Sequence, residues 1–288
     1  MDIIKSNAKI NIGLNVLGKR GDGYHELRMV MAPIDFCDIL EIEFKRGVYG
    51  EFSMSCNLNF IPTDRRNILF KIYDAFYEKT GLKPEKLRLN LIKRVPIQAG
   101  LGGGSSNGAF LLKYLNEKYD FVLNNEEMID VAKSIGADIP FFLTNKTSLV
   151  EGIGEKIFPI ENRLNCDVIL IKPNFGVSTK EAFENISKLS LKKDIRIDNI
   201  VFALKNNDID GVKANVFNDI ERGLLLTNQK IIDIKYIENK LKNINLFMSG
   251  SGSTYFALAR KESSEKVYQK LKNIFPSHSF FLYKTQFI

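Results

Sequence analysis

Four glycines within five positions form the segment of this chain that is best suited to chemistry. They are Gly100, Gly102, Gly103 and Gly104, and the next two residues are serines. Glycine allows positive φ and lets backbone N–H groups approach a ligand, and a helix that starts here adds the positive end of its dipole. The segment therefore favours a polyphosphate-binding loop over the plainer alternative, a flexible turn between a strand and a helix.

This predicted phosphate loop differs from three common nucleotide-binding motifs. A Walker A loop needs a lysine after its last glycine, where this chain has Ser105. A Rossmann fingerprint that begins at Gly100 or Gly102 needs glycine or alanine at Ser105 or Asn107. Protein kinases need HRD and DFG tripeptides, and neither occurs. The predicted loop comprises Pro96, Ile97, Gln98, Ala99, Gly100, Leu101, Gly102, Gly103, Gly104, Ser105 and Ser106.

The spacing of apolar residues predicts the elements that hold this loop. Alternating apolar residues predict strands over residues 8–16, 40–44, 52–60 and 87–91. Helical spacing predicts helices over residues 69–76, 111–119 and 126–135. The loop thus follows a strand and opens a helix. In the first strand, Lys9 and Asn11 share the face opposite the apolar residues.

The rest of the chain predicts an α+β fold with mixed, largely antiparallel sheets. Past Asp138 we expect a strand, a turn and a strand to about residue 172, helical segments over residues 178–241, strands at 245–248 and 254–259, a helix, and a last strand near Phe280. The length of 288 residues favours two domains, placed at residues 1–150 and 151–288, with a ligand in the cleft between them.

The composition of the chain limits the classes of partner that it could bind. A net charge of +7 favours anions such as nucleotides, and the basic residues are too scattered to predict a nucleic-acid partner. The three cysteines lack CxxC spacing, which indicates neither zinc nor a disulfide framework. No apolar run approaches the ~20 residues of a membrane-spanning helix, so we expect no membrane partner and a cytoplasmic location. Monomer and homodimer both remain open.

Three motifs in order make the chain resemble the GHMP kinases. They are residues 8–14 (AKINIGL), the phosphate loop, and residues 248–253 (MSGSGS). Within that superfamily, residues 19–27 (KRGDGYHEL) and 135–142 (IGADIPFF) are similar to stretches of the diphosphocytidyl-methylerythritol kinases. Shorter similarities lie at residues 67–69 and 176–179. Three positions depart from the family's pattern: Gln98 stands where a small residue is frequent, Gly108 where alanine is, and Ser253 where proline is.

The resemblance implies a two-domain GHMP kinase architecture with the active site in the inter-domain cleft. It also implies ATP-dependent phosphorylation of the 2-hydroxyl of 4-diphosphocytidyl-2-C-methyl-D-erythritol, in non-mevalonate isoprenoid precursor synthesis. Asp138 would accept the hydroxyl proton, with Lys9 beside it to stabilise charge. Asn67 would lie near the adenine or ribose of ATP. Mg²⁺ is expected with ATP, but its ligands are unknown, and Ser106 is the nearest candidate.

The same resemblance implies a site for the cytidine diphosphate substrate. Tyr24 and His25 would contact the cytosine, with Phe183 as the second wall of an aromatic sandwich. The substrate-binding set implied in this way comprises Asn11, Tyr24, His25, Asp138, Thr179, Phe183, Gly250 and Ser251.

Plainer alternatives remain for the residues taken singly. Asp138 could be a helix-terminus or turn carboxylate, Lys9 a solvent-facing strand lysine, and Phe183 a core residue. Asn67 could cap a helix, and residues 248–253 could form a tight turn. At the level of function, the rivals are another GHMP kinase, acting on homoserine or a mevalonate-like acid, and a nucleotide-binding regulator without turnover.

Overall fold

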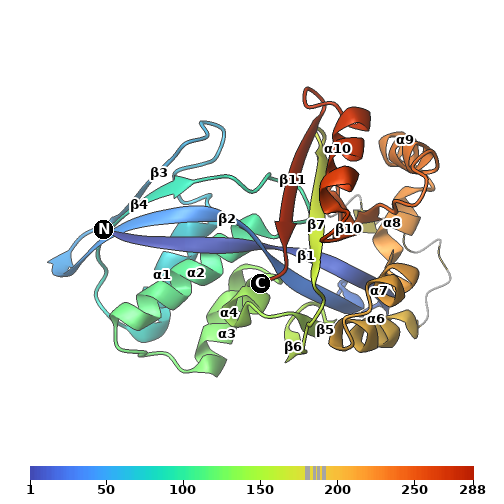
Figure 1. Ribbon diagram of the computed structural model, residues 1–288. Coiled ribbons are helices and arrows are strands. Elements are labelled where there is room, and N and C mark those ends of the chain that lie inside the picture. Colours follow the sequence, from blue (N-terminus) through green and yellow to red (C-terminus); the bar gives the residue numbers. More distant parts are fainter. Residues whose placement is uncertain (179–181, 184–185, 187–188, 190–192) are drawn as a thin grey trace. The chain divides into compact units, whose positions relative to one another are not determined.

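The protein, a computed structural model, is described at residues 1–178, 182, 183, 186, 189 and 193–288 (Figure 1). Its chain forms two compact units. Unit 1 comprises Met1–Ala8, Phe36–Pro96 and Gly102–Asn145, whereas unit 2 comprises Lys9–Asp35, Ile97–Leu101 and Lys146–Ile288. The units are discontinuous in sequence, unlike the predicted domains 1–150 and 151–288, whose single boundary stays a prediction.

Unit 1 is built on four strands in the order β3-β4-β2-β1. Their bounds are β1 (Asp2–Lys19), β2 (His25–Tyr49), β3 (Phe52–Cys56) and β4 (Glu85–Ile92), and unit 2 takes the second part of β1 and the first part of β2. β4 pairs antiparallel with β2, from Ile39↔Ile92 to Phe44↔Leu87, and parallel with β3. The phosphate loop follows β4 directly, as predicted.

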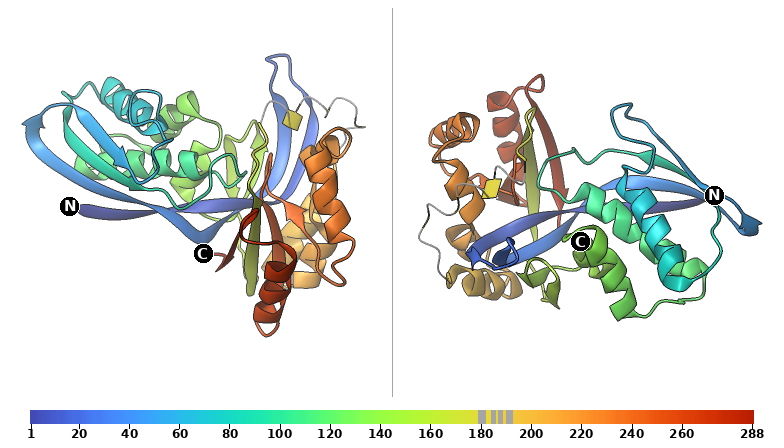
Figure 2. Two further views of the ribbon diagram at one scale, coloured as in Figure 1. Left: turned by 90° about the horizontal axis from the view of Figure 1, so that it is seen from above. Right: turned by 180° about the vertical axis from the view of Figure 1, so that it is seen from behind.

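Helices cover one face of these strands (Figures 1 and 2). They are α1 (Ile68–Thr80), α2 (Gly103–Lys118), α3 (Asn125–Ile135) and α4 (Ile139–Thr144). Each pairs with a helical neighbour, α1 with α2 and α3, and α4 with α2 and α3. The residues at helical spacing, such as Ile72, Phe76, Leu111 and Leu115, are fully buried. The apolar face of each helix thus forms the core of unit 1.

Unit 2 contains a four-stranded sheet in the order β11-β7-β10-β9. These strands are β7 (Cys166–Pro173), β9 (Phe247–Met248), β10 (Tyr255–Arg260) and β11 (Phe280–Gln286). All of its pairs are antiparallel.

Three shorter strands extend β1 and β2 within unit 2. They are β5 (Ser148–Gly152), which pairs antiparallel with β2 and with β6 (Lys156–Pro159), and β8 (Phe217–Asn218), which pairs parallel with β1. The helices of the unit whose bounds the structure gives are α6 (Arg196–Lys205), α7 (Ile209–Asn215), α8 (Asp219–Leu224), α9 (Gln229–Glu238) and α10 (Ser264–Ile274). They confirm the predicted helical region at its described residues from 196 to 238.

Some predicted elements are wrong. The order expected past Asp138, a strand, a turn and a strand, omits helix α4, which precedes β5, β6 and β7. A short apolar run (IPFFLT) suits a buried helix as well as a strand, and Pro140 is favourable in a first helical turn. The strand predicted over residues 52–60 ends at Cys56, where Asn57 bonds the backbone of Lys93 through both side-chain ends. The first strand is not half-buried, since Lys9, Asn11 and Asn15 on its polar face are buried too.

Candidate active site

Lys9 and Asn11 lie on the buried polar face of β1. Their exposed fractions are 4% and 3%, and the Lys9 Nζ donates to Asn11 Oδ1 at 2.5 Å. A buried ammonium costs free energy unless it is paired or hydrogen-bonded. A lysine in this position therefore indicates a role other than making the surface soluble. Lys9 is therefore not the solvent-facing strand residue of the plainer alternative.

The turn at residues 248–253 packs directly on these two side chains. Ser249 Oγ accepts from the Asn11 N–H at 3.2 Å and donates to the Gly100 carbonyl at 2.9 Å. A Cβ at Gly250 would lie 3.1 Å from Asn11 Oδ1 and 3.3 Å from Lys9 Nζ. The turn is more than a connection between two strands, because its backbone forms one wall around Lys9.

The first half of the phosphate loop joins the same cluster. The Lys9 N–H donates to the Leu101 carbonyl at 3.0 Å, and the Thr254 N–H donates to the Ala99 carbonyl at 3.2 Å. Unit 2 thus brings together the three motifs read from the sequence: β1, the loop segment Ile97–Leu101 and the turn at residues 248–253.

Gly100 is required at the centre of this contact. Its φ is +71°, and a Cβ there would lie 2.0 Å from the carbonyl oxygen of Ser249. A side chain would be strained by the left-handed conformation and would also collide with backbone that has no freedom to move away. This glycine serves the packing of the loop on the turn.

The second half of the loop belongs to unit 1 and starts helix α2. Gly102, with φ of +68°, is the N-cap, and its carbonyl accepts from the Ser106 N–H at 2.8 Å. The N–H groups of the first helical turn have no partner inside the helix, and the helix dipole adds partial positive charge at this end. No atom of the described residues lies within 4 Å of a Cβ built on Gly104, so their packing does not require that glycine. The N–H groups at the start of α2 and the open space beside Gly104 both suit a bound anion.

The buried hydroxyl of Ser106 supports the same interpretation. Ser106 is fully buried, and among the described residues its Oγ has no hydrogen-bond partner. A buried polar atom without a partner costs about 1–3 kcal/mol. A phosphate oxygen or a cation bound with it would satisfy this hydroxyl, which fits the candidate role of Ser106 beside Mg²⁺.

A buried ion pair fixes the backbone that leads into the loop. Lys93 Nζ lies 2.7 Å from Asp38 Oδ2, and Asp38 Oδ1 accepts from the Arg94 and Val95 N–H groups at 2.7 Å each. Burial lowers the pKa of Lys93, and the neighbouring carboxylate of Asp38 opposes that shift. A Cβ on Gly103 would lie 3.0 Å from Lys93 Nζ, so this ammonium packs against the start of α2.

The remaining loop residues differ in exposure. Pro96 is half-buried, Ile97 and Gln98 are exposed, and Ala99 and Leu101 are buried. Gln98 adopts φ of +48°, which costs a non-glycine residue roughly 1–2 kcal/mol. The backbone at Gln98 is thus left-handed, although glutamine replaces the small residue that is frequent at this position in the family.

Asp138 stands at the N-cap position of α4, in unit 1. Its carboxylate accepts no hydrogen bond from the first turn of that helix. The plainer role of a capping carboxylate is therefore absent, and α4 packs against α2, the helix that the glycines open. The role of Asp138 as proton acceptor stays a prediction.

Asn67 does cap a helix. Its Oδ1 accepts from the Leu69 N–H at 3.0 Å and its Nδ2 donates to the Pro62 carbonyl at 2.7 Å. The predicted contact with adenine or ribose is compatible with this cap and stays a prediction.

Tyr24 and His25 lie at the connection between β1 and β2, whereas Phe183 comes after β7. Tyr24 is 59% exposed, and the rings of His25 and Phe183 stack with centroids 4.9 Å apart. A base between two rings needs about 7 Å, because stacked bases are about 3.4 Å apart. The predicted sandwich therefore requires His25 and Phe183 to separate. Thr179 lies outside the described residues.

Two departures from the family's pattern have local explanations. A Cβ on Gly108 would lie 3.2 Å from Ile72 Cγ1, so glycine lets α1 approach α2 closely. Ser253 is fully buried and its hydroxyl donates to the Phe175 carbonyl, a bond that proline could not make. Ser251, two residues before it, is half-buried in the same turn.

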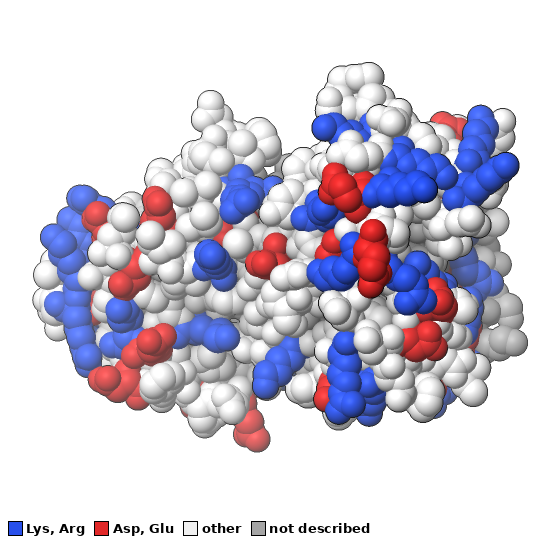
Figure 3. All heavy atoms as spheres, in the orientation of Figure 1, with Lys and Arg blue, Asp and Glu red and all other residues white. Residues whose placement is uncertain are grey.

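No metal cage accompanies the site. Within the described part of the chain, no group of three or more His, Cys, Asp or Glu side chains is placed to hold a metal ion. Figure 3 shows acidic side chains interspersed among the basic ones over the face drawn. In the same described residues, no helix is both long and apolar enough to cross a membrane.

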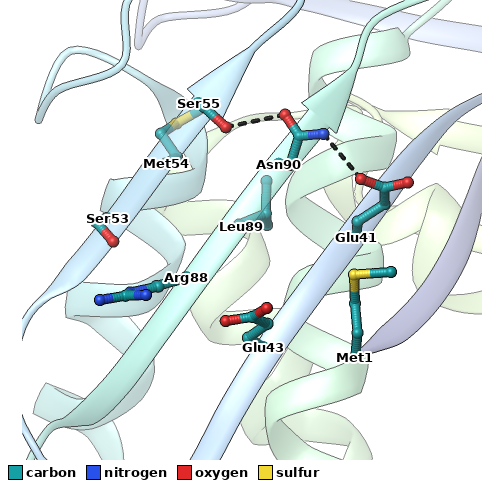
Figure 4. Close-up of a pocket in the computed structure, with 9 residues that line it drawn as sticks. All are labelled: Met1, Glu41, Glu43, Ser53, Met54, Ser55, Arg88, Leu89 and Asn90. Atoms are coloured by element: carbon teal, nitrogen blue, oxygen red, sulfur yellow. Dashed lines mark hydrogen bonds between the residues drawn. The ribbon is translucent and has the colours of Figure 1, made fainter.

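A hollow of about 370 Å³ lies on the strands of unit 1, and no predicted site residue lines it (Figure 4). Three of its polar side chains bond one another: Ser55 Oγ donates to Asn90 Oδ1 at 2.9 Å, and Asn90 Nδ2 donates to Glu41 Oε2 at 2.8 Å. Because neither the glycine-rich loop nor Lys9 lines the hollow, it is not a candidate for the nucleotide site.

Sequence reasoning missed the residues that hold the turn. Asn218 Nδ2 donates to the carbonyls of Met248 and Gly250, at 2.9 and 2.8 Å. The only signal in the sequence is an asparagine followed by Asp219 and Glu221, which is typical of any helix start.

This fold and the glycine-rich site define a GHMP kinase. The model of the GHMP kinases N terminal domain matches residues 67–146, and that of the GHMP kinases C terminal matches residues 201–277. A solved structure of 4-(cytidine 5'-diphospho)-2C-methyl-D-erythritol kinase superposes with a TM-score of 0.80 at 26% identity, covering 99% of each chain. The predicted fold class is confirmed.

Sequence relatives identify the family within that class. The chain is 42% identical to 4-diphosphocytidyl-2-C-methyl-D-erythritol kinase of Fusobacterium nucleatum, over 98% of this chain and 96% of the relative. It is 37% identical to the kinase of the same name from Clostridium perfringens, over 88% and 87%. The chain belongs to the 4-diphosphocytidyl-2-C-methyl-D-erythritol kinase family.

Proposed function

We propose that this protein transfers the γ-phosphoryl group of ATP to the 2-hydroxyl of 4-diphosphocytidyl-2-C-methyl-D-erythritol. The products are the 2-phosphate and ADP, and the step belongs to non-mevalonate isoprenoid precursor synthesis. The observation that carries the proposal is the cluster of Lys9, Asn11, the loop segment Ile97–Leu101 and the turn at residues 248–253 in a chain of this family. Homoserine and mevalonate-type substrates are disfavoured by the identity to these named relatives.

In the proposed mechanism the protein positions groups and neutralises charge. The glycine-rich loop and the start of α2 bind the phosphates of ATP through backbone N–H groups. Asp138 accepts the proton of the 2-hydroxyl as that oxygen attacks, and the Lys9 ammonium stabilises negative charge on the transferred group. Asn11 and the Gly250–Ser251 backbone orient the acceptor, while Tyr24, His25 and Phe183 contact the cytosine.

Mg²⁺ would supply charge neutralisation at the ATP phosphates. The residue that fits it is Ser106, whose buried hydroxyl lacks a partner among the described residues. Mg²⁺ keeps several waters and also binds phosphate oxygens, so the Ser106 hydroxyl would be one ligand among several. A cytoplasmic location and a monomeric or homodimeric state stay predictions.

The test is transfer of label from γ-labelled ATP to 4-diphosphocytidyl-2-C-methyl-D-erythritol, with homoserine and mevalonate in parallel. We expect label on the first alcohol alone. Label on another alcohol would keep the kinase class and overturn the cytidine site. If no alcohol is labelled although ATP binds, a regulator without turnover becomes the better description.

The same assay tests Asp138. Asp138→Asn should lower kcat by at least about 100-fold, the usual contribution of a proton-accepting side chain. The fold should persist, because asparagine keeps the size and shape of the half-buried Asp138 side chain. Asp130→Asn is the matched control, since Asp130 forms only an exposed ion pair with Lys133 in the same unit. A kcat within a few-fold of the unmodified protein would exclude the assigned role.

A further inference from the structure

Residues 217–221, called here the polar strap, are buried although three of the five are polar. The strap consists of β8 and the first turn of α8, and Asn218, Asp219 and Glu221 are 4%, 3% and 8% exposed. Buried polar groups persist when they are hydrogen-bonded, so their partners indicate what such a segment holds in place.

Asn218 uses both ends of its amide. The Oδ1 atom caps α8 by accepting from the N–H groups of Ile220 and Glu221, at 2.9 and 3.3 Å. The Nδ2 atom donates to the carbonyls of Met248 and Gly250. Serine, threonine or aspartate could supply the cap, but among the preferred capping residues only asparagine adds two N–H donors. The donors to the turn therefore distinguish this position from an ordinary cap.

Asp219 attaches the strap to β1. Its Oδ2 accepts from Asn15 Nδ2 at 2.8 Å and from the Val16 N–H at 2.9 Å. β8 also pairs with β1 at Gly13↔Phe217 and Leu14↔Asn218. Because the same strand carries Lys9 and Asn11, the strap fixes the turn relative to those two side chains.

Glu221 anchors the other side of the strap. Its Oε1 lies 3.1 Å from Lys235 Nζ, and Lys235 also donates to the Leu246 carbonyl at 2.9 Å. Leu246 immediately precedes β9, the strand that leads into the turn. The strap therefore supports the turn in two ways, directly through Asn218 and indirectly through the Glu221–Lys235 ion pair.

The position held in this way is critical because the space around Lys9 is tight. A Cβ on Gly250 would lie only 3.3 Å from Lys9 Nζ and 3.3 Å from the Gly100 carbonyl oxygen. A shift of the Gly250 backbone by a few tenths of an ångström would change the separation between the ammonium and the backbone of the turn.

We propose that Asn218 is a positioning residue for phosphoryl transfer, which holds the Met248 and Gly250 carbonyls so that the turn keeps its place against Lys9 and Asn11. Asn218 acts through the turn and does not itself touch a substrate. The inference rests on the proposed function, because it assigns the turn and Lys9 to the same transfer reaction.

The test is Asn218→Asp, which keeps the shape and the capping oxygen. The variant loses both donors and directs a carboxylate at two carbonyl oxygens. We expect kcat to fall at least tenfold while KM for ATP stays within twofold and the protein still melts cooperatively. Asn228→Asp is the matched control, because Asn228 caps α9 through the Ile231 N–H and should keep all three quantities.

The possible results separate this inference from the proposed function. If unmodified protein transfers label and Asn218→Asp keeps kcat within twofold, the inference is overturned and the proposed function stands. A raised KM for ATP at unchanged kcat also overturns it, since that result assigns Asn218 to binding. If Asn218→Asp fails to melt cooperatively, Asn218→Ser decides: its hydroxyl caps and donates once, so an intermediate kcat supports positioning and an unmodified kcat opposes it. If the unmodified protein transfers no label, both proposals fall.

Discussion

The glycine-rich segments and the stacked rings of His25 and Phe183 are held by different kinds of contact. Gly100 packs on the backbone of the turn, and Gly250 packs on the Gly100 carbonyl and on the buried Lys9 and Asn11 side chains, so each position is surrounded by atoms that a side chain would displace. His25 and Phe183 are two partly exposed side chains whose rings stack on each other.

The difference separates two ways in which a residue can matter for function. A change in a backbone-packed site alters the fold and the chemistry together, because the same contacts serve both. A change in a site made of partly exposed side chains should alter binding with little effect on stability. Three substitutions test this contrast.

Gly100→Ala should produce the largest effect. The added Cβ meets the Ser249 carbonyl oxygen and the left-handed φ is strained, so we expect a loss of about 3 kcal/mol in the free energy of unfolding. Urea denaturation measures this loss. Gly81→Ala is the control, since Gly81 has φ of +67° but no atom within 4 Å of the built Cβ. Equal losses at both positions would show that packing at Gly100 adds nothing to strain.

Gly104→Ala tests whether the contrast holds inside the loop. No protein atom lies near the added methyl group, and alanine in a helix is favoured over glycine by roughly 0.5–1 kcal/mol. We expect unchanged or slightly higher stability but a KM for ATP raised by roughly tenfold, equivalent to about 1.4 kcal/mol. An unchanged KM would mean that ATP does not approach the backbone at Gly104.

Phe183→Ala should have little effect on stability, because the Phe183 ring is partly exposed. Burial, followed by the charge of Lys19, lowers the pKa of His25 below its usual value. Between this folded pKa and about 6.5 the unfolded chain binds more protons, so stability rises with pH across that window. Removing the Phe183 ring exposes the imidazole and should return the pKa towards 6.5.

Proton NMR follows this titration readily, because the chain has only two histidines. The substitution His278→Gln identifies the His25 resonance. If the aromatic pair binds cytosine, Phe183→Ala should also raise KM for the cytidine substrate by roughly fivefold, about 1 kcal/mol of stacking. A fixed His25 pKa together with an unchanged KM would contradict both roles of the ring.

The sequence predicted those parts of the site whose signal is local. Consecutive glycines identify the phosphate loop by residue type alone, and alternation located β1 together with the shared face of Lys9 and Asn11. Helix α4 was missed because its six residues are too short and too apolar for the period to distinguish helix from strand.

The contacts of the polar strap could not be predicted from the sequence, for a different reason. The carbonyls that Asn218 holds lie 30 and 32 residues away along the chain. Every residue has the same backbone carbonyl, so the residue types at positions 248 and 250 do not show that these two carbonyls accept hydrogen bonds. The burial of Lys9 likewise depends on Gly250, far along the chain.

The division of the chain between units has a consequence for biosynthesis. The chain passes between the units after residues 8, 35, 96, 101 and 145, so neither unit is a continuous segment, and only unit 1 is fully made by residue 145. Gly13 leaves the ribosome early, yet its partner Phe217 is made 204 residues later. At roughly 5–20 residues per second this delay is about 10–40 s. During that time all residues of unit 1 are made, whereas β1 still lacks β8, its partner in unit 2.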